Sequence, residues 1–139
     1  MEKAKVLLVD DDRDFVETGR IALEASGKYE VIAAYSTQEG LQKVKQENPD
    51  AVVVDLFMEK PDSGIELVRN LRSQRSDVPI MVLTSNSGPV RYAELSEEVR
   101  ELGVSRCVKK PVQPGQFSNL VGRLLNPAFY ELEPMAYEM

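Results

Sequence analysis

The chain contains no histidine and only one cysteine among its 139 residues. Without histidine it cannot carry a Ser-His-Asp triad, a Cys-His pair or a histidine-ligated zinc ion. With Cys107 as the single cysteine there is no disulfide within the chain, which is consistent with a reducing compartment. Chemistry performed by this chain's own side chains must therefore use carboxylates, hydroxyls or lysine.

Long hydrophobic runs are also missing. No apolar stretch approaches the roughly 20 residues that span a bilayer, and the first residues lack the small-residue cleavage site of a secretory leader. We therefore expect a cytoplasmic protein that is not inserted in a membrane. The net charge of −6 argues against direct nucleic-acid binding, because phosphate backbones are bound by clustered Lys and Arg.

Length and composition suit one globular domain. A content of 42% hydrophobic and 29% charged residues is ordinary for a domain of this size, which can bury a substantial core. The periodic pattern stops after Leu125, at Asn126-Pro127. We expect one domain over residues 1–125, followed by an acidic tail, residues 126–139, that contains two tyrosines and a phenylalanine.

Five short apolar runs predict β-strands: Val6 to Val9, Tyr29 to Tyr35, Ala51 to Val54, Ile80 to Leu83, and Val104 to Val108. Three of these runs are nearly continuous, as expected for parallel strands covered on both faces. A parallel sheet needs a crossover between successive strands, and the segments between the runs are long enough to supply helices.

Stretches with helical periodicity separate and follow these strands. The last stretch places its apolar residues on one face: Phe117, Leu120, Val121, Leu124 and Leu125. Ser36 or Thr37 can cap the second helix, and Gly27 and Gly103 stand where helices are expected to end. The alternation predicts an α/β fold with a doubly wound, five-stranded parallel sheet and helices on both faces.

Polar residues follow four of the predicted strands: Asp10, Asp11 and Asp12 after the first, Asp55 after the third, Thr84 and Ser85 after the fourth, and Lys109 and Lys110 after the fifth. Ligands of open α/β sheets bind at this carboxyl edge, so we expect these groups to converge. Crowded carboxylates repel one another unless a cation or raised pKa values relieve the charge. Ligands that are all oxygen favour Mg²⁺, with Mn²⁺ possible in its place.

Phosphoryl transfer is the chemistry that suits this set. An aspartate can act as the nucleophile and form an aspartyl phosphate, while a metal, a lysine and a hydroxyl share the phosphoryl charge. Each group also has a structural interpretation. The aspartates after the first strand can form a solvated turn with a helix cap, Asp55 can pair with Lys110 in a structural ion pair, and Thr84 can fill a strand.

Asp10-Asp11, Asp55, Thr84 and Lys110-Pro111, each closing a strand in this order, resemble the bacterial response-regulator receivers of two-component phosphorelays. The resemblance covers residues 4–125 and implies a single-domain receiver with the flavodoxin-like (βα)5 fold of chemotaxis regulators. It implies that Asp55 is the phosphoacceptor. Mg²⁺ would be held by Asp10, Asp11, Asp55 and the backbone carbonyl of Phe57.

The same resemblance assigns further roles. Lys110 would pair with the phosphoryl group, and Thr84 would be the switch hydroxyl. Phe57 and Asn86, two positions after Asp55 and Thr84, correspond to variable positions that tune the phosphoryl lifetime. The Lys110-Pro111 peptide bond is cis in many relatives.

A receiver is a regulatory phosphoacceptor that assists its own phosphorylation and dephosphorylation, and is not an enzyme in the usual sense. The resemblance implies a sensor histidine kinase or a phosphotransfer protein as the donor. Phosphorylation of Asp55 would switch the face formed by the fourth helix, the fifth strand and the fifth helix. That face would bind a downstream protein or a second copy of the chain.

The chain departs from the family pattern in three places. The loop after Asp55, LFMEKPDSG, is one residue longer than usual, the stretch from Thr84 to Lys110 is also longer, and Cys107 replaces the usual Tyr or Phe. These departures suggest an alternative, a non-phosphorylated pseudo-receiver that acts as a constitutive protein-interaction module, whereas the retained acidic and basic site groups argue against it. A haloacid-dehalogenase-type phosphatase fits poorly, because Phe57 stands where it needs a second aspartate.

Overall fold

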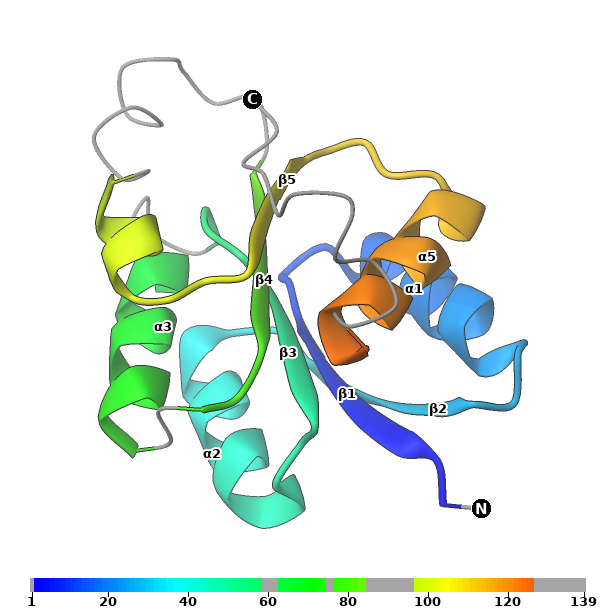
Figure 1. Ribbon diagram of the computed structural model, residues 1–139, viewed down its shortest axis with the longest axis horizontal. Helices are drawn as coiled ribbons and strands as arrows, with labels where there is room; N and C mark the ends of the chain where they lie inside the picture. The colour runs from blue at the N-terminus through cyan, green and yellow to red at the C-terminus, as the bar shows by residue number, and fades with distance from the viewer. Residues whose placement is uncertain (1, 59–62, 75–76, 85–96, 127–139) are drawn as a thin grey trace.

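The computed structural model describes residues 2–58, 63–74, 77–84 and 97–126. Its strands form one parallel sheet of five, in the order β2-β1-β3-β4-β5 (Figure 1). The strands are β1 (Ala4–Val9), β2 (Tyr29–Ala34), β3 (Ala51–Asp55), β4 (Ile80–Thr84) and β5 (Arg106–Lys109). The helices are α1 (Arg13–Glu24), α2 (Thr37–Glu47), α3 (Ser63–Gln74) and α5 (Pro114–Leu125), and residues 97–101 are also helical.

The helices cover both faces of the sheet. Helices α1 and α5 lie together on one side, and α2, α3 and the helical residues 97–101 lie on the other (Figure 1). This arrangement confirms the predicted doubly wound α/β fold. None of the helices in the described ranges combines the length and apolar character needed to cross a bilayer.

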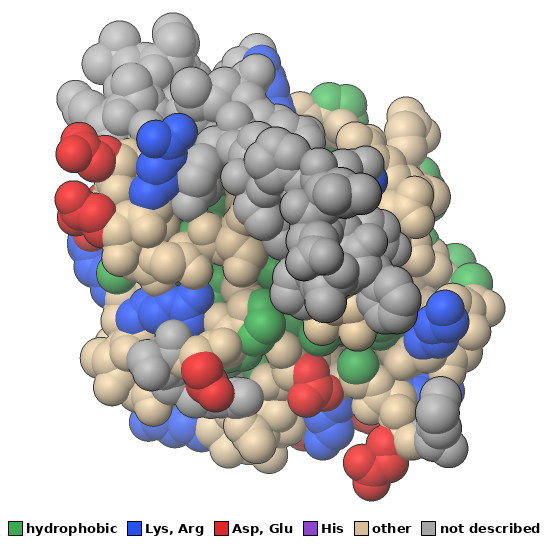
Figure 2. Space-filling model, in the orientation of Figure 1, with side chains coloured by type: hydrophobic (Ala, Val, Ile, Leu, Met, Phe, Trp, Pro, Cys, Tyr) green, Lys and Arg blue, Asp and Glu red, His purple; other side chains and the backbone are tan. Residues whose placement is uncertain are grey.

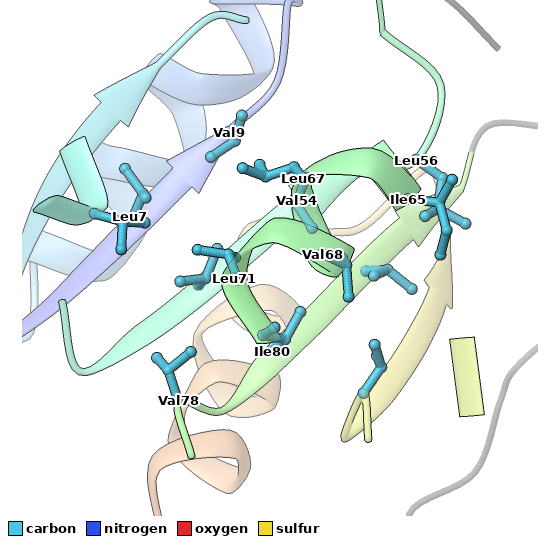
Figure 3. Close-up of a cluster of buried hydrophobic side chains, with 14 of the residues drawn as sticks. Leu7, Val9, Val54, Leu56, Ile65, Leu67, Val68, Leu71, Val78 and Ile80 are labelled. Carbon is cyan, nitrogen blue, oxygen red and sulfur yellow. The ribbon is translucent and has the colours of Figure 1, made fainter. Parts of the chain in front are cut away.

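Two apolar clusters, one on each side of the sheet, make up the core. Strand residues of one parity, such as Leu7 and Val9, pack with α2, α3 and residues 97–107, and Figure 3 shows this cluster around α3. Residues of the other parity, such as Val6 and Leu8, pack with α1 and α5. Because successive side chains of a strand point to opposite faces, parity decides which helices each strand residue meets.

The ends of several elements follow the predicted signals. Ser36 is the N-cap of α2, where its hydroxyl oxygen accepts a hydrogen bond from the Glu39 N–H at 3.2 Å. Gly27 and Gly103 have φ angles of 76° and 72°, in the left-handed region that glycine enters without strain. The predicted N-cap Ser36 and the two predicted helix-end glycines are thereby confirmed.

The fifth strand was predicted to begin too early. It starts at Arg106, because the Val104 N–H closes the preceding helical turn by donating to Val99 O at 3.3 Å. The second strand likewise ends at Ala34 instead of Tyr35.

Acidic and basic side chains are interspersed on the surface seen in Figure 2. Of the predicted tail, only Asn126, the C-cap of α5, is among the described residues.

Candidate metal and phosphoacceptor site

Three carboxylates meet at the carboxyl edge of the sheet. Asp10 and Asp11 follow β1, Asp55 ends β3, and one carboxylate oxygen from each lies within 4.8 Å of the others. Strands β1 and β3 are parallel neighbours, so their carboxyl ends bring these residues together. Asp10 and Asp55 are buried, whereas Asp11 is exposed and can reach a solvated ligand.

Lys110 reaches this cluster from the end of the edge strand β5, two strands away from β3. It follows β5, and its ammonium donates to Asp10 Oδ2 at 2.6 Å and to Asp55 Oδ2 at 3.2 Å. Its backbone N–H donates to Thr84 O at 2.8 Å, which ties the end of β5 to the end of β4. One cation therefore joins two carboxylates that come from different strands.

The ionisable groups of the cluster perturb one another. Burial raises the pKa of Asp55 from 3.8 to about 6; the charge of Asp10 also raises it, while the Phe57 N–H and Lys110 oppose the increase. Burial alone would lower the pKa of Lys110, but its hydrogen bond to Asp10 and the nearby negative charges raise that pKa above the ordinary value. Three ionised carboxylates and one ammonium leave a formal charge of −2 (−3 + 1). A divalent cation would neutralise this charge.

Backbone N–H groups orient the two buried carboxylates. The Phe57 N–H donates to Asp55 Oδ1 at 2.9 Å, and the Asp12 N–H donates to Asp10 Oδ1 at 3.0 Å. Asp12 is itself the N-cap of α1, so the third aspartate has the structural role that the sequence left open. The remaining oxygens of Asp10 and Asp55 both contact Lys110.

The start of α3 is pressed against the candidate phosphoacceptor strand. A Cβ at Gly64 would lie 2.3 Å from Asp55 O and 2.4 Å from Leu56 Cα, so only glycine fits there. The Gly64 N–H donates to Leu56 O at 3.0 Å. Gly64 was not singled out from the sequence, although a glycine at the first turn of a helical pattern was the available signal.

Comparison with known proteins identifies the family. The sequence model of the family described as "Response regulator receiver domain" matches residues 6–122. The chain belongs to this family. The receiver assignment and the link to two-component signalling are thereby confirmed.

Two curated relatives show how this receiver compares with longer regulators. The alkaline phosphatase synthesis transcriptional regulatory protein PhoP of Bacillus subtilis is 36% identical over 123 residues, which are 87% of this chain and 48% of that protein. Response regulator MprA of Mycolicibacterium vanbaalenii is 43% identical over 81 residues, 58% of this chain and 34% of that protein. The chain thus spans at most about half the length of these relatives.

Solved receivers share the fold over nearly their whole length. The CheY-like receiver domain protein of Methanospirillum hungatei JF-1 matches with a TM-score of 0.78 and 25% identity, covering 94% of this chain and 99% of that one. The chemotaxis response regulator CheY4 of Vibrio cholerae matches with a TM-score of 0.75 and 29% identity, covering 89% of this chain and 100% of that one.

Two predicted switch positions of the receiver, Thr84 and Cys107, belong to the face of the sheet that α2 and α3 cover. Thr84 is buried at the end of β4 and has the strand parity of Val82, which packs on the α2/α3 side. Cys107 is 2% exposed and belongs to the same cluster. The Lys110-Pro111 bond is cis, as the resemblance implies.

Of the remaining predicted positions, the structure describes Phe57 but not Asn86. Phe57 is half-buried and its N–H binds Asp55, while the metal-binding role of its carbonyl stays a prediction. Asn86 and much of the two stretches predicted to be longer than usual, residues 59–62 and 85–96, lie outside the described residues. Phe15, whose ring contacts the Lys110 ammonium, was missed, because no local pattern marks a ring that packs against a residue 95 positions away (110 − 15).

Proposed function

We propose that this receiver is phosphorylated on Asp55 in a reaction that depends on Mg²⁺, with Mn²⁺ as a possible substitute. The observation that carries the proposal is the bridge from the Lys110 ammonium to both Asp10 and Asp55, beside a third carboxylate. A structural ion pair needs one carboxylate per lysine. Two carboxylates on one lysine, with a third carboxylate beside them, instead match a site that also receives a divalent cation and a phosphoryl group.

The donor set fits Mg²⁺, which prefers oxygen ligands and keeps part of its water shell. Asp10, Asp11, Asp55 and the carbonyl of Phe57 would hold it. When bound, the cation would supply positive charge next to the phosphoryl oxygens. Its presence would also favour the ionised form of Asp55, whose pKa in the metal-free protein is raised to about 6.

The chain's own residues account for the transfer step. An ionised Asp55 oxygen attacks the phosphorus of the donor, the new O–P bond forms as the donor's bond to phosphorus breaks, and the donor group leaves with that electron pair. The Phe57 N–H donates to Asp55 Oδ1, so Oδ2, which accepts from Lys110, would be the oxygen that reacts. Lys110 would then stabilise the phosphoryl charge.

The output would be a change of contacts. Thr84, at the end of β4, would turn its hydroxyl to the phosphoryl group and bring the segment that follows it. The affected face would comprise the helical residues 97–101, β5 and α5.

A sensor histidine kinase or phosphotransfer protein would donate the phosphoryl group in the cytoplasm. A downstream protein or a second copy of the chain would bind the altered face. Neither direct nucleic-acid binding nor membrane insertion is part of the proposal.

One observation favours the pseudo-receiver as a second candidate. The residue at the usual aromatic switch position, Cys107, is small and buried in the α2/α3 cluster. A thiol has no ring to move between exposed and buried positions. In that case the same face would bind its partner without phosphorylation.

Intact-mass measurement with a small phosphodonor tests the choice. The purified chain is incubated with acetyl phosphate, with Mg²⁺ or with a chelator, alongside Asp55→Asn and Asp50→Asn. Asp50 is the matched control, since it directly precedes β3 whereas Asp55 ends it. We expect one added phosphoryl group in wild type and Asp50→Asn only with Mg²⁺, and none in Asp55→Asn. A wild type that gains no mass under any of these conditions would favour the pseudo-receiver.

A further inference from the structure

The Lys110 ammonium has a neighbour that the proposed chemistry does not use. Its Nζ lies 4.4 Å from the centre of the Phe15 ring, in addition to its two carboxylate partners. A cation above a ring face is attracted by the negative π cloud, and the attraction grows where water is excluded. The Lys110 side chain is 17% exposed, so most of the water has been removed from this contact.

Phe15 is tied to the acidic cluster through its backbone. The Asp12 carboxylate accepts a hydrogen bond from the Phe15 N–H at 3.2 Å, and the Asp12 N–H donates to Asp10 Oδ1 at 3.0 Å. The Phe15 ring then contacts Lys110, whose ammonium returns to Asp10 Oδ2. These contacts form a closed loop that begins and ends on one buried carboxylate.

The Phe15 ring also contacts α5. It packs edge-to-face on Phe117, with ring centroids 5.9 Å apart and an interplanar angle of 65°. Helices α1 and α5 approach closely at this level, since a Cβ at Gly19 would lie 3.1 Å from Phe117 Cε2. The α1 backbone that carries Phe15 is therefore packed closely against α5, and a leucine in place of Phe117 would still give the ring an apolar neighbour on that side.

We propose that Phe15 is a positioning residue for Lys110. Its ring keeps the ammonium between Asp10 and Asp55, and so sets how fast Asp55 takes a phosphoryl group. The kinetic part rests on the proposed function, whereas the contact of ring and ammonium stands on geometry alone. A leucine at this position would fill part of the same space without an attractive face, and Lys110 would spend less time in the productive position.

Three variants separate this role from general packing. Phe15→Leu removes the ring, and Phe15→Tyr keeps it. Phe117→Leu removes a buried ring of the same cluster while leaving Phe15 beneath Lys110. All are made in the full chain, with urea denaturation as the measure of stability. The phosphorylation rate is followed by intact mass with acetyl phosphate and Mg²⁺. Carbon-proton NMR of the metal-free chain reports the Lys110 methylene next to the ammonium, assigned with Lys110→Met.

The ring-current shift is the readout that a purely structural role would not move. We expect the Lys110 methylene protons to be shifted upfield in wild type, Phe15→Tyr and Phe117→Leu, and to return to ordinary values in Phe15→Leu. The phosphorylation rate should fall about three- to ten-fold in Phe15→Leu and stay within about two-fold of wild type in the other two.

Each contrary result has its own meaning. An unshifted Lys110 methylene in wild type would overturn the proposed contact, whether or not the chain is phosphorylated. Equal rate losses in Phe15→Leu and Phe117→Leu at matched stability would overturn the positioning role and leave packing as the cause. A wild type that takes no phosphoryl group would refute the proposed function and with it the kinetic part of the proposal. The NMR comparison would still decide the contact.

Discussion

The two faces of the sheet carry different parts of the proposed switch. By strand parity, Asp10, Asp55 and Lys110 belong with the residues that pack against α1 and α5. Thr84 and Cys107 belong with those that pack against α2, α3 and residues 97–104. The charged groups that would perform the chemistry therefore belong to one face of the sheet, and the positions that would report it belong to the opposite face.

The two faces are also attached differently. On the α1/α5 face the described contacts near the site are aromatic and apolar, with Phe15 and Phe117 in direct ring contact. On the other face arginines of α3 add polar links to the segment before β5: Arg72 donates to Leu102 O and Gly103 O, and Arg69 pairs with Glu98. Water can replace polar links more readily than close packing. Residues 97–104, on the α2/α3 side, are thus attached partly by exchangeable bonds, whereas α5 is attached by close packing.

The largest effect should come from Gly64, where α3 meets the strand that carries Asp55. Gly64→Ala should lower the free energy of unfolding by about 3 kcal/mol or more, because the added Cβ meets backbone atoms that cannot rotate away. Urea denaturation measures the change. Gly19→Ala, which meets only side-chain atoms of Leu8 and Phe117 at 3.0 and 3.1 Å, should cost about 1 kcal/mol.

Gly115→Ala is the control for these helix positions. An added Cβ there meets nothing within 4 Å, so it should leave stability unchanged or raise it by up to about 1 kcal/mol. A Gly64→Ala chain as stable as Gly115→Ala would show that α3 can move off β3, the strand that carries Asp55, at little cost. The two faces would then be equally adaptable.

Arg72 should give the next largest effect. Its guanidinium donates to Leu102 O at 2.6 Å, to Val78 O at 2.7 Å and to Gly103 O at 2.9 Å. Arg72→Leu removes all three bonds from half-buried surroundings and should lower the free energy of unfolding by about 2 to 3 kcal/mol. Hydrogen exchange should rise mainly in residues 97–104. Equal acceleration throughout α1 and α5 would contradict the idea that this link serves one face.

Asp55 should make stability depend on pH. Because its pKa is raised from 3.8 to about 6, the native state binds more protons at Asp55 than the unfolded state does between these values. The free energy of unfolding of the metal-free protein should therefore fall as pH rises through this window.

Asp55→Asn isolates this contribution. At pH 7 without metal the variant should be more stable than wild type by about 2 kcal/mol, and the difference should shrink towards pH 4. Adding Mg²⁺ should stabilise wild type and not the variant. Parallel pH curves for the two proteins would mean that Asp55 does not titrate at an elevated pKa.

The smallest effect should come from the pair formed by Arg69 and Glu98. Their side chains are 49% and 34% exposed, and the Arg69 guanidinium donates to Glu98 Oε1 at 2.8 Å. A double-mutant cycle with alanine at both positions should give a coupling of about 0.5 kcal/mol that weakens with added salt. A coupling that is large and insensitive to salt would mean that this pair, and not Arg72, is the main link to residues 97–104.

Local patterns were enough to predict most of the fold and the charged half of the site. Parallel strands covered on both faces require continuous apolar runs, and their carboxyl ends share one edge of the sheet. Asp10, Asp11, Asp55 and Lys110 stand at such ends, so the topology alone predicts that they converge. The start of β5 was misjudged, because Val104 is apolar whether it continues a strand or closes a helical turn.

Only the tertiary structure decided how these groups are held. The sequence predicts aspartates at a strand end. It does not predict that Asp12 caps α1 while Asp10 accepts a hydrogen bond from Lys110. Nor does it show that Gly64 touches the Asp55 backbone or that Phe15 lies against Lys110. The apolar pattern of a strand depends on neighbouring residues, so a short stretch of sequence is enough to recognise it. The distance between side chains from separate elements depends on how closely helices and sheet pack, which the whole chain determines together.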